Sequence, residues 1–113
     1  MQIVDCSNTE HYLWGIGCDG WHLIKHEDLS IITERVPAGQ SEQPHFHTYS
    51  RQFFYILTGE AVIEINGERK VLQAQQGIEI APGVVHQFCN ESSSEVTFLV
   101  ISAPKSHGDR INV

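Results

Sequence analysis

The chain has few basic residues. Its 113 residues include seven lysines and arginines against 14 aspartates and glutamates, which gives a formal charge of −7. Arg69-Lys70 is the only pair of adjacent basic residues. We therefore expect no nucleic-acid footprint and no basic amphipathic stretch for an anionic membrane. The acidity indicates a well-solvated surface.

Paired cysteines and long apolar runs are also missing. The chain has an odd number of cysteines and no C-x-x-C pair; the three are Cys6, Cys18 and Cys89. This argues against a disulfide framework and favours a reducing compartment. The first residues lack a charged leader followed by an apolar segment. No apolar run approaches the ~20 residues that cross a bilayer. We expect a cytoplasmic protein.

No segment carries a convincing helical period, whereas short apolar runs recur between turn residues. Asn66-Gly67 is a strong hairpin signal between two of these runs. The pattern predicts an all-β sandwich or barrel that forms a single domain over residues 1–113. The first twenty residues give no clear pattern. The tail after Pro104 is expected to be an irregular arm that is solvated, with folding near the mouth of the pocket as the alternative. The expected strands cover residues 29–36, 52–57, 61–65, 69–72, 78–81, 86–89 and 96–102.

The strand expected over residues 52–57 is apolar on both faces. If Gln52 points into the barrel, alternation makes Phe53, Tyr55 and Leu57 point outward. A strand that is apolar on both faces is normally covered on both. The cover is either the N-terminal segment or another subunit, and we expect a homodimer.

Three histidines and one glutamine form the candidate functional site. His45 and His47 lie one residue apart, so on a strand their side chains point the same way and can bind one ion together. Gln52 opens the next strand, and His86 follows the turn at Pro82-Gly83. Three imidazoles and an amide oxygen in one pocket would bind a divalent transition metal.

These residues also carry a family resemblance. One stretch resembles the first signature motif of the cupin superfamily: Gly39, five residues, His45-x-His47, four residues, Gln52, six residues, Gly59. The family usually has Glu at the position of Gln52. Pro82-Gly83-x-x-His86-x-x-x-Asn90 resembles the second motif, although the glycine that normally opens it falls on Gln75. Together the two motifs and the segment between them span about half of the chain.

The resemblance implies an antiparallel double-stranded β-helix, or jelly-roll barrel, with a metal inside. Cupins commonly bind Zn, Mn, Fe, Ni or Cu at the positions that match His45, His47, Gln52 and His86. Because Gln52 replaces a carboxylate, four neutral donors would leave the metal formally dicationic. We expect such a site to prefer a small anionic ligand.

Two functions from different classes fit this pattern. The first is a metal-dependent enzyme of the dioxygenase, isomerase or decarboxylase type, with an apolar wall supplied by Phe54, Ile56 and Phe88. No general base stands out, which weakens this interpretation. The alternative is a non-catalytic module that binds or senses a small molecule, since the fold does not choose between them. A purely structural role is the least favoured, because converging buried histidines are costly without a metal.

The four remaining histidines have no ligand spacing, and we expect no functional role for them. They are His11, His22, His26 and His107.

Overall fold

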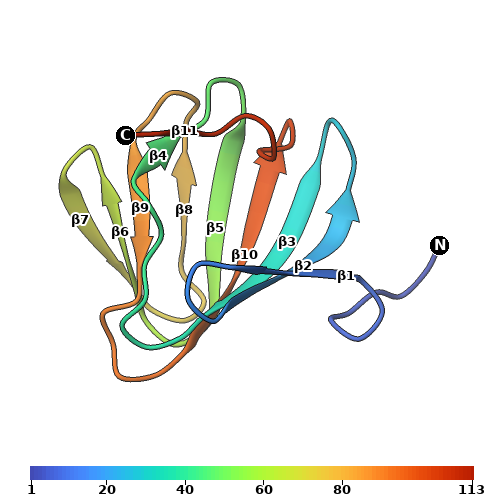
Figure 1. Ribbon diagram of the computed structural model, residues 1–113, viewed down its shortest axis with the longest axis horizontal. Helices are drawn as coiled ribbons and strands as arrows, with labels where there is room; N and C mark the ends of the chain where they lie inside the picture. Colours follow the sequence, from blue (N-terminus) through green and yellow to red (C-terminus); the bar gives the residue numbers. More distant parts are fainter.

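The computed structural model describes residues 1–113 as two antiparallel sheets that face each other (Figure 1). The larger sheet has six strands in the order β1-β2-β3-β10-β5-β8. The smaller sheet has five strands in the order β11-β4-β9-β6-β7. The strands are β1 (Glu10–Trp14), β2 (Cys18–Lys25), β3 (Ser30–Val36), β4 (His45–Phe46), β5 (Arg51–Thr58), β6 (Ala61–Ile65), β7 (Glu68–Leu72), β8 (Gly77–Ile80), β9 (His86–Cys89), β10 (Val96–Ala103) and β11 (Ile111–Asn112).

This architecture confirms the all-β jelly-roll prediction. Each of the seven expected strands is present, with bounds that differ by a residue at most. The turn between β6 and β7 has positive φ at both Asn66 (49°) and Gly67 (84°), which is the conformation that makes Asn-Gly so favourable in a two-residue hairpin. All three cysteines are free, and Cys18 and Cys89 are buried.

The two ends of the chain are more ordered than the sequence suggested. The unassigned first twenty residues form β1 and the start of β2, which pair with each other in register from Glu10↔His22 to Trp14↔Cys18. After Pro104 the chain is not a free solvated arm but lies at the cavity, which is the alternative that the sequence left open. The C-terminal segment, red in Figure 1, crosses one end of the barrel from β10 and ends as β11, which pairs with β4.

The core lies between the sheets and is built from the inward positions of the strands. Gln52, Phe54 and Ile56 are buried along β5, as their alternation predicted, while Phe53 between them is 38% exposed. Phe88 and Phe98 stack at the centre with ring centroids 4.1 Å apart. Both rings belong to the buried core cluster.

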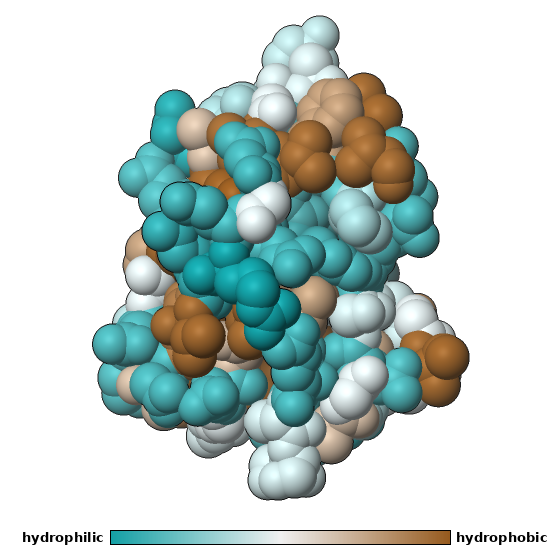
Figure 2. Space-filling model, turned by 90° about the vertical axis from the view of Figure 1, so that its left-hand side faces the viewer, coloured by the Kyte–Doolittle hydropathy of each residue, from teal (hydrophilic) through white to brown (hydrophobic).

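The outer edge of the smaller sheet is protected by charge. Strand β7 has four exposed residues, three of them the charged Glu68, Arg69 and Lys70. Charged side chains on an edge strand discourage pairing with another chain. Figure 2 shows this side of the molecule as mainly hydrophilic, with smaller apolar patches. The structure contains no helix with the length and apolar character needed to cross a membrane.

Candidate metal centre

The fold brings His45, His47 and His86 together. His45 lies on β4 directly opposite His86, the first residue of β9, and their ring centroids are 4.4 Å apart. A backbone hydrogen bond holds the turn before β9 against His47, because the Gly83 N–H donates to the His47 carbonyl at 2.7 Å. All three side chains are buried, and one potential ligand atom from each lies within 4.8 Å of the others. We call these residues the histidine cluster.

Backbone carbonyls fix which nitrogen each imidazole offers. The Nδ1 atoms of His45 and His86 lie 2.8 and 2.9 Å from the carbonyl oxygens of Gln43 and Val84, and Nδ1 of His47 contacts the Asp109 carbonyl. Because a carbonyl oxygen only accepts, each Nδ1 carries the proton and each Nε2 keeps its lone pair. Nε2 of His86 is buried with no partner.

Burial keeps the cluster neutral. It lowers the pKa of all three histidines, and that of His45 falls to about 3. The neutral imidazole is the form that binds a metal, so at neutral pH no proton has to leave first.

Gln52 adds a fourth free donor atom. Its Nε2 donates to Ser102 Oγ at 3.1 Å, on the neighbouring strand β10. That bond fixes the direction of the amide, and Oε1 is left buried without a partner. An unpartnered buried carbonyl oxygen costs free energy unless a ligand satisfies it. Three imidazole nitrogens and one amide oxygen therefore fit a divalent transition metal.

The C-terminal segment closes over this cluster. The Asp109 carboxylate accepts the backbone N–H groups of Thr48, Tyr49 and Ser50 at 2.8, 2.8 and 2.9 Å. Although burial raises it, these three donors hold the pKa of Asp109 below its usual value. The Asp109 carbonyl accepts the Nδ1–H of His47. Sequence analysis did not find this role of Asp109, because the two residues lie more than 60 positions apart.

A second group, the acid cluster, consists of Tyr12, Glu34 and Glu42. The Tyr12 hydroxyl donates to Glu34 Oε2 at 3.3 Å. Burial, and next the negative charge of Glu42, raise the pKa of Glu34 to about 8. Burial also raises the pKa of Glu42 to about 7, although its Oε1 accepts the Phe88 N–H at 3.0 Å. These carboxyls are two buried titratable groups that the sequence analysis did not single out.

One sign of the acid cluster was available in the sequence. Glu34 lies between Ile32 and Val36 on the inward parity of an expected strand, and both of those neighbours are buried in the structure. A carboxyl at an inward position is costly, and it indicates either a partner or a function. Tyr12 had no such sign, because β1 was not recognised.

Two members of the histidine cluster and the whole acid cluster line one cavity of about 360 Å³, whereas His86 is not part of its lining. Its lining includes His45, His47, Gln52 and the acid cluster, together with His107 and Arg110 from the C-terminal segment. Of the three residues proposed for an apolar wall, Phe54 lines this cavity, whereas Ile56 and Phe88 lie in the packed core and do not line it.

Comparisons with known proteins find relatives in sequence and in fold. Polyketide synthase CurC of Streptomyces cyaneus is 30% identical over 66 residues, which are 58% of this chain and 43% of that protein, so the chain spans less than half of its relative. The polyketide cyclase RemF from Streptomyces resistomycificus superposes with a TM-score of 0.85 at 20% identity, over 100% of this chain and 85% of RemF.

A third relative was solved with a ligand. A variant of Streptomyces Pac13 with uridine superposes with a TM-score of 0.80 at 19% identity, over 96% of this chain and 88% of that one. Pac13 is a nucleoside dehydratase. Structural likeness at these identities shows the fold alone.

The sequence itself matches a family model. The model of the cupin domain covers residues 32–102, which is more than half of the chain and includes the histidine cluster and Gln52. With this match and the jelly-roll topology around the histidines, the chain belongs to the cupin family.

Proposed function

We propose that this protein is a metal-dependent enzyme that acts on a small, anionic organic molecule by proton transfer. The observation that carries the proposal is the meeting of two groups in one cavity: imidazoles and an amide with free lone pairs, and carboxyls whose pKa lies near neutrality. Zn, Mn, Fe, Ni or Cu suits the donor set of His45, His47, His86 and Gln52.

Each group has a distinct task in such a reaction. His45, His47, His86 and Gln52 would hold the metal, which would supply Lewis acidity at a substrate oxygen. Glu34 accepts or delivers a proton, because a carboxyl with a pKa near the working pH exchanges it readily. Tyr12 orients this carboxyl through its hydroxyl. Arg110, which also lines the cavity, pairs with a negative group of the substrate.

The acid cluster favours some of the reaction types that the sequence allowed. Isomerisation and decarboxylation both require a proton to be moved at carbon, and so does dehydration, the reaction of Pac13. The polyketide-related relatives are also proteins of small-molecule chemistry by name. We therefore place this protein among enzymes that convert small carbonyl or hydroxyl compounds.

Hydrogen exchange at carbon tests the proposal without a known product. Metal-loaded protein is incubated in D₂O with a panel of small keto and hydroxy acids, and loss of the C–H signal beside the carbonyl is followed by NMR. Glu34→Gln should slow this exchange about 10²–10⁴-fold while metal content is unchanged. Glu79→Gln is the matched control, since Glu79 is exposed on β8 and pairs only with Arg51. Equal exchange in wild type and Glu34→Gln contradicts the role of Glu34.

One observation favours the alternative of a non-catalytic binding or sensing module. Glu42 is held by the Phe88 N–H and lies 3.7 Å from the Arg110 guanidinium, so this carboxyl has a structural task already. A binder would show saturable, reversible uptake of a panel compound with no exchange. The same NMR samples report both quantities, so one experiment separates the two functions.

The homodimer remains a proposal as well. Phe53 is 38% exposed on the outer face of β5 and stacks on Tyr55 with ring centroids 6.3 Å apart. A second copy packed on this face would bury both rings. Sedimentation should then give a dimer for wild type and a monomer for Phe53→Arg. A wild-type monomer at high micromolar concentration would contradict the homodimer.

A further inference from the structure

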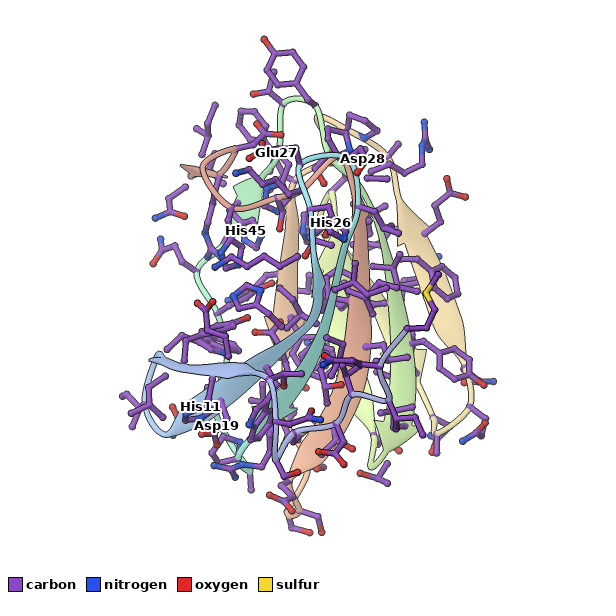
Figure 3. All side chains as sticks on the ribbon, turned by 90° about the vertical axis from the view of Figure 1, so that its right-hand side faces the viewer. His11, Asp19, His26, Glu27, Asp28 and His45 are labelled. Atoms are coloured by element: carbon purple, nitrogen blue, oxygen red, sulfur yellow. The ribbon has the colours of Figure 1, made fainter.

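A second cavity of about 330 Å³ lies beside the metal site. It is bounded by the hairpin between β2 and β3 on one side and by the segment after β10 on the other, where the Lys105 N–H donates to the Glu27 carbonyl at 3.1 Å. Figure 3 shows His26 just below the tip of this hairpin, in the same half of the barrel as His45. His107 lines both cavities.

The lining of this second cavity has no hydrophobic residue and an excess of hydrogen-bond donors. The donors are the side chains of His22, Lys25, His26, Ser30, Lys105 and His107. An ammonium has three N–H donors and no acceptor, and each imidazole or hydroxyl can donate one more bond. The only carboxylate in the lining is Glu27. Such a site fits an occupant that only accepts hydrogen bonds.

The ion pairs already present leave most of this capacity free. Lys105 contacts Glu27 and Lys25 contacts Glu10, both at 3.0 Å. The side chains of Glu27 and Glu10 are 87% and 60% exposed, so these pairs are screened by water and weak. An anion that reaches the cavity can therefore replace either carboxylate.

His22 is the observation that points to a ligand. It is only 8% exposed, and its Nδ1 is buried with no hydrogen-bond partner. The ring is held between Tyr12 and His107, with centroids 5.0 and 5.1 Å away. A buried polar side chain without a partner is unusual in a native protein and calls for an explanation.

The charges around His22 also favour an anion. Burial, and next the positive groups His107 and Lys25, lower the pKa of His22. Burial, Lys25 and Lys105 do the same for His107. A negative ion among them would offset this repulsion and allow both imidazoles to donate charge-assisted hydrogen bonds.

We propose that this second cavity binds a phosphate group, independently of any metal. Phosphate offers at least three strongly accepting oxygens, which suits a lining with more donors than a carboxylate could use. The inference goes beyond the proposed function, because no residue of the metal set takes part. Since the cavity exceeds the size of one ion and shares His107 with the metal site, its occupant is either the free ion or the phosphate of a larger substrate.

Titration of inorganic phosphate into metal-free protein tests this site. The experiment is done in EDTA and followed by calorimetry and by the NMR signals of the histidine rings. We expect saturable binding, with larger shifts at His22 and His107, which line the cavity, than at His11, which lies outside the lining and contacts Asp19 (Figure 3). Binding that does not saturate, or that shifts all exposed histidines alike, would overturn the proposal.

Two substitutions should act in opposite directions. Lys105→Gln should weaken phosphate binding at least about tenfold, the effect of losing one charge-assisted hydrogen bond. Glu27→Gln should strengthen it, because the competing carboxylate is gone. Lys70→Gln is the matched control, since Lys70 is exposed on β7 and pairs only with Glu68. If Lys105→Gln and Lys70→Gln weaken phosphate binding equally, the effect comes from the overall charge of the protein, and the proposed site is overturned.

The same titration separates this proposal from the metal-dependent function. Equal phosphate affinity in EDTA and with added Zn²⁺ supports a separate site. Binding seen only with Zn²⁺ would place the ion on the metal, which overturns the second cavity but leaves the proposed enzyme intact. A comparison with glycerol phosphate identifies where the bound phosphate comes from. Tighter binding of glycerol phosphate than of inorganic phosphate means that the cavity recognises the phosphate of a substrate. Equal affinities mean that it holds the free ion.

Discussion

The histidine cluster and the acid cluster share one cavity and differ in how they are held. Each imidazole of the histidine cluster is fixed by a backbone carbonyl behind it, and burial keeps it neutral with a free lone pair. In the acid cluster, burial has the opposite consequence. It raises the pKa of Glu34 and Glu42, so these groups keep a proton near neutral pH.

The same physical cause thus prepares two different chemistries. Desolvation disfavours whichever form is charged, so it removes the proton from a histidine and retains it on a carboxyl. One side of the cavity becomes ready for a cation and the other for proton exchange. The predictions below alter one cluster at a time, which shows whether the two act separately.

The largest effect is expected from removing one imidazole. His47→Ala deletes a ligand from the histidine cluster, and protein purified without added metal should lose its stoichiometric metal by elemental analysis. His26→Ala is the control, because His26 is exposed and outside the cluster. Full metal content in His47→Ala would refute the site. Unchanged metal in Glu34→Gln would show that the acid cluster is not needed to hold it.

The histidine cluster was largely predictable, because its information is local. His45 and His47 are two positions apart on one strand, and the turn before His86 has its own sequence signature. Alternation along β5 then placed Gln52 and Phe54 on the inner face. The fold class followed from the spacing of the strands and the Asn66-Gly67 hairpin.

The acid cluster was not predictable in the same way, because it is assembled from separate segments. Tyr12 comes from a strand with no clear pattern, and Glu42 comes from the loop before β4. The alternation of side chains along a strand also does not tell how far along the barrel an inward residue lies. It placed Ile56 on the inner face correctly, yet that residue lies in the core and not at the cavity. The contacts of Asp109 depend on the path of the C-terminal segment, which no local signal encodes.

A second test weakens the support of the histidine cluster without touching a ligand. Asp109→Asn removes the carboxylate that accepts three backbone N–H groups beside His47. Zn²⁺ affinity, measured by competition with a chelating dye, should fall about 10–100-fold, as when outer partners of a ligand are lost. Asp28→Asn, on the exposed hairpin between β2 and β3, is the control. Unchanged affinity would mean that the Asp109 carboxylate does not position His47.

A third test adds charge to the neutral donor set. Gln52→Glu should tighten metal binding at least about tenfold, because a unit charge at coordinating distance attracts the dication strongly. It should also reduce the preference of the metal-loaded site for a carboxylate over its amide analogue, since the net local charge falls. Titration of both compounds into both proteins measures this. If wild type shows no preference for the carboxylate, the anion argument fails.

A fourth test concerns stability, and it isolates the acid cluster. An unperturbed glutamate ionises near pH 4.5, whereas burial, and next the charge of Glu42, raise the pKa of Glu34 to about 8 in the folded protein. Between these values the folded protein holds a proton that the unfolded chain has released. The free energy of unfolding should therefore fall as the pH rises, by up to about 1.4 kcal/mol per pH unit, and this contribution should level off above the folded pKa.

Replacing the carboxyl by an uncharged amide should remove that slope. Metal-free wild type, Glu34→Gln and the control Glu79→Gln are unfolded with urea at several pH values from about 5 to 8. Wild type and Glu79→Gln should lose stability over this range, and Glu34→Gln should lose clearly less. Parallel curves for all three proteins would mean that Glu34 is already ionised in the folded state. The acid cluster would then hold no proton to exchange, and the contrast with the histidine cluster would disappear.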